Sequence, residues 1–253
     1  MAVGLGLALA ANSPAEIRQF DKSTTEKLGV AIYEQDIRAA IATDLLLAKK
    51  IDAKKEGLRG WIVEGDAYTM LVRFVREKDG PPEAFYDVMF DGTRPPTLQV
   101  PSDRRLTPAQ LALFKARNLA SKGIKRPASR TYNIVMLPDP ATDGLLVYAL
   151  AASVVPNEVV VGGHYRFSIS KDGERVLRGD ELFVSFLKLS TKPGDLPAGA
   201  HPEALFMNTL LSDLPLETHV YLSLLHKVPL YVSTRDHRIW KVEGGTITTA
   251  NPG

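Results

Sequence analysis

The chain has 253 residues, with 31 lysines and arginines against 29 aspartates and glutamates, a formal net charge of +2 and no cysteine. A chain of this length buries a full hydrophobic core without disulfides, and the near-neutral charge balance predicts no nucleic-acid partner. The absence of cysteine excludes disulfides, thiolate metal sites and a cysteine nucleophile. It also suits an oxidising compartment, without requiring one.

The N-terminal stretch MAVGLGLALAANS is small and apolar, and Ala8-Leu9-Ala10 has the A-x-A form that a signal peptidase accepts. No basic residue precedes Arg18, so a basic n-region is missing. We interpret residues 1–13 as a truncated export leader, which predicts a periplasmic or secreted protein. The alternative is an apolar strand or tail in a cytoplasmic protein. The run is too short to span a bilayer, and no transmembrane segment is expected in the mature chain.

The first part of the chain, residues 14–127, has the pattern helix, hairpin, helix. A long helix is predicted over 24–50, because Ser23 and Glu26 form a capping box. Apolar residues also recur along one face of it, at Leu28, Ile32, Ile37, Ile41, Leu45 and Ala48.

A hairpin and a second helix follow. β-branched and aromatic residues predict strands at 61–63, 68–76 and 85–90, with a turn at Asp79-Gly80. The second helix is predicted over 107–122, with Thr107 as its cap, Pro108 at its first position and Gln110 closing the box.

The second part, residues 128–253, is rich in strands, with a short third helix predicted over 202–213. Closely spaced turn signals favour antiparallel pairing over βαβ units. We therefore predict an α+β fold in which an antiparallel β-sheet is covered on one side by about three helices. The two parts are expected to pack as one unit, and a two-lobed arrangement that divides near 91–130 is the alternative.

The stretch GGHYRFSISKDG places a histidine directly after two glycines. In a strand, Tyr165, Phe167 and Ile169 share one face, which suits a core, while His164, Arg166 and Ser168 share the opposite, polar face. These three polar residues form a candidate binding face, and the alternative is an ordinary solvated sheet surface. Gly162-Gly163 leads into a strand and not into a helix, so a bulge or close backbone packing is expected there in place of a phosphate-binding loop.

A second candidate lies in ETHVYLS, which we interpret as a strand. Glu217 and His219 then share a face, and a carboxylate beside an imidazole can orient a base or bind a metal. No compact zinc spacing and no G-x-S-x-G elbow is present in the sequence, so no metal site and no cofactor is expected. The acids of DPATDG lack the spacing of a calcium loop and indicate a turn.

The segments VVVGGHYRFSISKDGERV and LPLETHVYLSLLHKVPLYVSTRDHRIWKVEGGTI resemble a group of uncharacterised exported proteins from proteobacteria. The resemblance covers residues 58–247. It implies an exported bacterial protein, and it implies no activity, fold or site residue.

We expect a non-catalytic exported protein that binds another protein or a small ligand, because no convergent catalytic set is visible. The alternative is a hydrolase or metal-dependent enzyme that uses Glu217 and His219, with His164 as a further member. That alternative requires one of the imidazoles to line a concave pocket, with a carboxylate within hydrogen-bond reach. An intracellular interaction domain is a third hypothesis.

Overall fold

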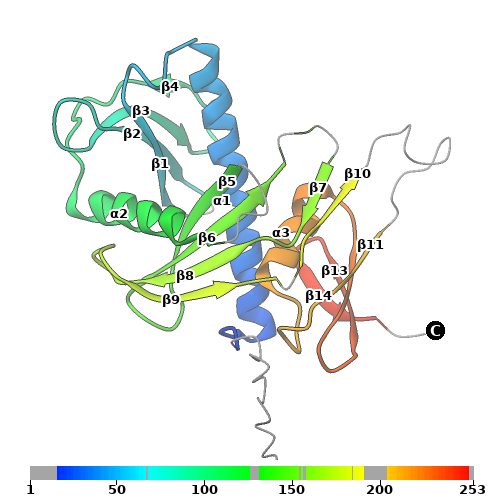
Figure 1. Ribbon diagram of the computed structural model, residues 1–253. Coiled ribbons are helices and arrows are strands. Elements are labelled where there is room, and N and C mark those ends of the chain that lie inside the picture. The colour runs from blue at the N-terminus through cyan, green and yellow to red at the C-terminus, as the bar shows by residue number, and fades with distance from the viewer. Residues whose placement is uncertain are drawn as a thin grey trace, which may run out of the picture.

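The computed structural model describes residues 16–66, 68–125, 131–153, 155, 158–183, 185–190 and 204–250. Within these residues the chain forms three helices and four sheets, and the predicted α+β class is confirmed (Figure 1). Among the strands that the structure describes, all pairs are antiparallel except one. No helix in the described part of the chain is both long and apolar enough to cross a membrane.

The first sheet has the order β1-β2-β3-β4 and contains the predicted hairpin. Its buried face, with Val72 and Phe74 at the centre, packs against Ala42 and Leu46 near the end of the first helix. The strands are β1 (Leu58–Gly65), β2 (Met70–Arg76), β3 (Glu83–Phe90) and β4 (Leu98–Gln99).

In the second and central sheet, strands β5, β6 and β8 are largely buried on both faces, whereas β9 is mostly exposed. Ile134 and Met136 pack toward α2 (Pro108–Gly123), while the alternate residues Val135 and Leu137 join the core on the side of the other two helices. This is the arrangement expected when successive side chains of a strand point to opposite faces. The strand order is β5-β6-β8-β9, and the strands are β5 (Thr131–Pro138), β6 (Leu145–Ala152), β8 (Tyr165–Ile169) and β9 (Val176–Glu181).

The third sheet contains the one parallel pair, between β11 (Leu205–Asn208) and β12 (Leu230–Ser233). Its order is β11-β12-β13-β14, with β13 (Ile239–Glu243) and β14 (Thr246–Thr249). A separate two-stranded ribbon joins β7 (Glu158–Val161) to β10 (Leu187–Ser190).

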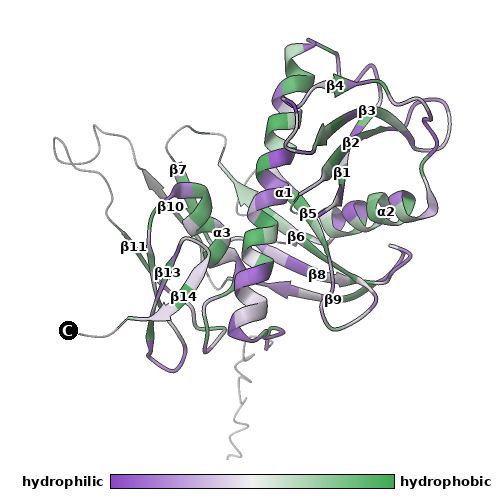
Figure 2. Cartoon of the chain, turned by 180° about the vertical axis from the view of Figure 1, so that it is seen from behind, coloured by the Kyte–Doolittle hydropathy of each residue, from purple (hydrophilic) through white to green (hydrophobic). Residues whose placement is uncertain are grey.

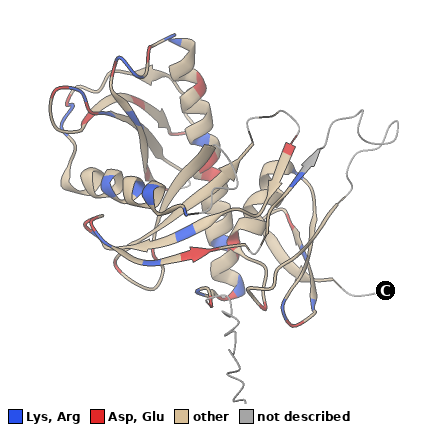
Figure 3. Ribbon diagram, in the orientation of Figure 1, with Lys and Arg blue, Asp and Glu red and all other residues tan. Residues whose placement is uncertain are grey.

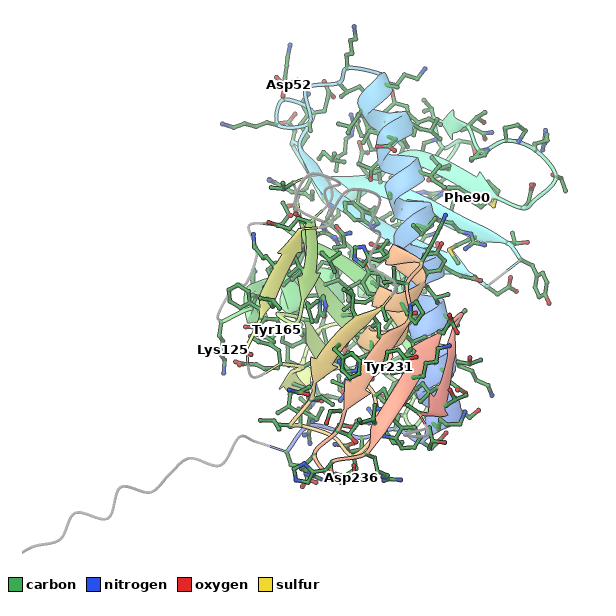
Figure 4. All side chains as sticks on the ribbon, turned by 90° about the vertical axis from the view of Figure 1, so that its right-hand side faces the viewer. Asp52, Phe90, Lys125, Tyr165, Tyr231 and Asp236 are labelled. Atoms are coloured by element: carbon green, nitrogen blue, oxygen red, sulfur yellow. The ribbon has the colours of Figure 1, made fainter. Side chains whose placement is uncertain are left out.

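Helix α1 (Lys22–Ala48) is the longest described helix and connects several parts of the fold. It contacts the first, second and third sheets, and it packs most extensively on α3 (Glu217–His226). Figure 4 shows it running from the end marked by Asp52 and Phe90 toward the end marked by Asp236, and Figure 2 shows its alternating polar and apolar surface from behind. The two helices approach very closely at Gly29, where a Cβ would lie 2.4 Å from the Cβ of Val220.

The start of one helix was predicted correctly and the start of another was not. The capping box of α2 is confirmed, since Thr107 and Gln110 exchange both hydrogen bonds. The predicted cap of α1 is wrong, because α1 begins one residue before Ser23. Its cap is Asp21, whose carboxylate accepts the N–H of Thr24 at 2.8 Å.

Two predicted elements of the second part are wrong. Within the predicted helix 202–213, the described residues include strand β11, and the ETHVYLS segment is helical, because it forms α3. Residues 217–223 of α3 are all buried. A helix that is buried all round has no polar stripe, so the 3.6-residue period that distinguishes a helix from a strand is missing from its sequence.

Candidate functional site

The polar residues singled out in the sequence converge where β8 meets α3. Arg166 is 1% exposed, and its guanidinium lies 2.5 Å from the Glu217 carboxylate and 2.7 Å from Asp180. The hydroxyl of Tyr148 donates to the same Glu217 oxygen at 3.0 Å. The strand alternation was predicted correctly, but the polar face of β8 is not a solvated surface. It is covered because α1 and α3 pack on that side of the sheet.

The N-terminal segment before α1 completes this ion network. Arg18 forms a bidentate pair with Asp139, at 2.6 and 2.7 Å, and its side chain also reaches Ser168 at 3.4 Å. Arg166 donates to the backbone carbonyl of Arg18, and the Arg18 N–H donates to Asp180 at 3.2 Å. Figure 3 shows basic and acidic segments side by side where β8 and β9 pass the start of α1.

The network balances its own charge. Arg178 also binds Asp180, at 2.7 Å, so three guanidinium groups face three carboxylates; the members are Arg18, Arg166, Arg178, Asp139, Asp180 and Glu217. Burial works to lower the pKa of Arg166, but the charge of Glu217 and its other partners outweigh it, and the pKa is raised. A compensated network of this kind joins elements together and leaves no carboxylate of Glu217 or Asp180 unpaired for chemistry.

His164 is a buried hydrogen-bond acceptor. It is 1% exposed, and its Nδ1 accepts the N–H of Ala151 at 3.0 Å. Its Nε2 is buried without a hydrogen-bond partner among the described residues. Burial, reinforced by the nearby His219, lowers the pKa of His164 to about 3. The ring is therefore neutral at physiological pH.

His219 repeats this arrangement at the start of α3. Its Nδ1 accepts the N–H of Leu216 at 3.0 Å, which stabilises the first turn of the helix. Burial lowers its pKa to about 4. Because the Nδ1 lone pair of each imidazole binds a backbone N–H, the remaining proton of each neutral ring is on Nε2. Neither ring has a free lone pair for a metal ion or for accepting a proton.

Glu217 and His219 do not form an acid–base pair. Two positions apart on a helix are about 200° apart around its axis. The Glu217 carboxylate is directed to Arg166 and Tyr148, whereas the His219 ring is directed to its own helix start. The predicted pairing depended on a strand and is wrong for that reason.

Sequence reasoning missed a third buried group, which joins α1 to α3. The hydroxyl of Tyr221 donates to Asp36 at 2.8 Å, and burial raises the pKa of that carboxyl. Tyr221 also lies edge-on to His164, with ring centroids 6.4 Å apart. The available signal was the pair Gln35-Asp36, two polar residues in the middle of a helix that must bury one face.

A surface hollow lies elsewhere, between α2 and the turns that follow β5 and β8. We call it the α2 groove, and its volume is about 970 Å³. Leu111, Leu113 and Leu145 are among its apolar lining residues, and charged side chains line it as well. The charged members are Lys115, Asp143, Lys171, Asp172, Glu174 and Arg175.

Two smaller hollows accompany the groove. One, of about 410 Å³, lies beside the β2–β3 turn, and the other, of about 110 Å³, is apolar and lies between Leu47 and Trp61. None of the three hollows is lined by His164 or His219. The described residues include no group of three or more histidine or acidic side chains arranged to hold a metal ion.

Fold and site together define an α+β protein whose most conspicuous polar residues are internal and mutually paired. Comparison of the chain with protein-family models, with curated proteins and with solved structures gives no match. The geometry of the chain itself is therefore the basis for inferring its function.

Proposed function

We propose that this chain is a non-catalytic, exported binding protein, and that its ligand, another protein or a small molecule, binds in the α2 groove. The observation that carries the proposal is the groove itself. Its lining combines apolar side chains with charged groups of both signs, which is a composition that suits a binding site.

The state of the polar residues supports a role without catalysis. Glu217 is paired with Arg166, and the acceptor nitrogens of His164 and His219 bind backbone N–H groups. A hydrolase would need one of these groups free and facing a hollow that admits substrate. All three side chains are instead at most 9% exposed.

Export is supported by the sequence alone. The A-x-A motif at Ala8-Leu9-Ala10 lies outside the described residues, and the chain has no cysteine that an oxidising compartment would threaten. The resemblance to exported bacterial proteins points the same way. N-terminal sequencing of the protein from its host tests this part directly, and a mature start near Ala11 is the expected result.

The binding proposal is tested with two ligand sources, peptides selected from a random phage-displayed library and a library of small-molecule fragments. Each peptide or fragment is added to the ¹⁵N-labelled chain, and its binding site is mapped from the changes in amide chemical shift. Ligands are expected to shift residues of the groove, and Leu111→Lys should abolish the shifts. Leu210→Lys is the control, because Leu210 is 63% exposed and lies outside the groove. Hydrolysis of ester or phosphoester substrates that is lost in Glu217→Gln would instead establish the enzyme.

A further inference from the structure

Strand β9 forms an open edge of the central sheet beside the α2 groove. The backbone N–H of Leu182 donates to the backbone carbonyl of His164 at 3.0 Å, and Phe167 lies opposite Gly179 in the ladder. Hydrogen-bonded and non-hydrogen-bonded pairs alternate along an antiparallel ladder, so the Phe167–Gly179 pair is of the second kind. The N–H and C=O of Gly179 therefore point away from β8, and no described residue binds them.

Two other strand edges among the described residues are closed by side chains, those of β14 and β5. On β14, Glu26 accepts the outward N–H of Ile247 at 2.7 Å, and Lys22 donates to its C=O at 3.1 Å. On β5, Gln35 accepts the N–H of Met136 at 3.4 Å. Open edges favour pairing with other chains, and proteins commonly block them. The edge of β9 differs in this respect from the edges of β14 and β5.

The surface of β9 suits contact with another chain. Val176 is 44% and Leu177 58% exposed, and Gly179 has no side chain to obstruct an approaching backbone. Leu177 also lines the α2 groove, so the edge and the groove form one continuous surface. An extended polypeptide placed along the edge would bury these apolar side chains.

Helix α2 reaches this part of the sheet and is basic. It packs mainly on β5 and β6 and also contacts β9. Gly173, at the turn before β9, packs against Ala112, and Gly123 packs against Phe167, so two points of α2 lie close to the β8–β9 hairpin. Lys115 and Lys122 are two turns apart on the same side of α2, and therefore about 10 Å apart. Lys115 reaches toward the hairpin, where it binds Glu174 at 2.7 Å, and Lys122 has no ion pair among the described residues.

We infer that β9 binds an extended segment of another protein by strand addition, and that the segment carries acidic residues at alternate positions. Alternate side chains of a strand are about 7 Å apart on one face, so acidic residues can reach both lysines while the intervening side chains point away. This inference rests on the proposed binding function and specifies its partner. A second copy of the chain is disfavoured, because it would bring the basic side of another α2 to this one.

The probe is a fluorescein-labelled octapeptide of alternating valine and glutamate, and its affinity is measured by fluorescence anisotropy at low salt. A version with lysine for glutamate and a version N-methylated at alternate residues should each bind at least tenfold more weakly. Gly179→Pro should cause a similar loss, because proline removes an outward N–H that the sheet does not use. Thr249→Pro, at an outward position of β14, is the matched control and should bind normally.

A charge variant keeps the test decisive if the proline variant folds poorly. Lys122→Glu should weaken binding about threefold, as expected for one exposed charge pair, and Lys49→Glu, at an exposed position at the end of α1, should not. If the peptide binds equally well after its N-methylation and to the Gly179→Pro variant, strand addition at β9 is wrong. If the octapeptide does not bind at all, the inference about β9 is also wrong. In both cases the proposed binding function stands if ligands from the library screens still map to the α2 groove. Self-association that Gly179→Pro abolishes in sedimentation would make a second copy the partner.

Discussion

His164 stands out in the sequence as a candidate for chemistry, but its imidazole is buried and has a structural role. Its position after two glycines suggested chemistry, yet the ring accepts one backbone N–H and is 1% exposed. The strand period correctly separated it from Tyr165 and Phe167, which pack toward α2. The period cannot report that α3 covers the other face, because that cover comes from residues about fifty positions later in the chain.

The two buried imidazoles predict that acid destabilises the fold. The pKa values of His164 and His219 are lowered from 6.5 to about 3 and about 4. Below pH 6.5 the unfolded chain binds protons that the folded chain does not. The stabilisation is therefore complete above pH 6.5 and is lost as the pH falls toward 4, by about 1 kcal/mol per pH unit for each ring.

The measurement is urea unfolding at pH 7 and pH 5. His164→Asn keeps an acceptor for the Ala151 N–H and removes one titrating ring, so the loss of unfolding free energy between the two pH values should be smaller than in the wild type. His237→Asn is the control, because His237 lies in an exposed turn. An equal pH dependence in the wild type and in His164→Asn would contradict the assignment of this ring as neutral and buried.

At the scale of elements, features that depend on neighbouring residues in the sequence were predicted correctly. Features that depend on contacts between distant elements were not. The start of α2 follows from hydrogen bonds between neighbours, Thr107 and Gln110. The buried face of α1 begins as predicted with Leu28 and Ile32, but Ile41 is 40% exposed, and the face continues through residues that include Ala39 and Ala42. Small residues are buried there because neighbouring elements approach closely, which no hydrophobicity pattern encodes.

The ion pair between β8 and α3 should be a strong link between elements. Arg166→Met leaves the carboxylates of Glu217 and Asp180 buried without that cation, and we expect a loss of about 3–5 kcal/mol in unfolding free energy. The double variant Arg166→Met/Glu217→Gln should recover part of that loss, because one uncompensated charge is removed. Denaturant unfolding monitored by circular dichroism measures both.

Arg235→Met is the control for this experiment. Its pair with Asp213 has the same 2.7 Å separation as Arg166–Asp180, but both side chains are nearly half exposed. Exposed pairs contribute less than about 1 kcal/mol. Similar losses in Arg166→Met and Arg235→Met would show that the buried network does not join β8 to α3 as we describe.

The whole molecule depends on α1, which contacts three of the four sheets. The two tryptophans of the chain are Trp61 in β1 of the first sheet and Trp240 in β13 of the third sheet. The fluorescence of each tryptophan therefore reports on the unfolding of a different region. Because one helix supports both regions, we expect them to unfold together. Trp61→Phe and Trp240→Phe should each leave one tryptophan as fluorophore. In each variant, the urea midpoint measured by tryptophan fluorescence should coincide with the midpoint measured by circular dichroism, which reports on the whole chain. Two separate midpoints would favour the two-lobed alternative.

The sequence by itself determined the α+β class, the first hairpin, the start of α2 and the inward direction of Tyr165 and Phe167. These features arise from turn chemistry, caps and side-chain alternation, which act between residues close together in the chain. The tertiary structure alone decided that ETHVYLS is a helix, that Arg166 is compensated by Glu217, and that β9 is an open edge. Each of these depends on which distant segment covers a given face, and local periodicity carries no information about that cover.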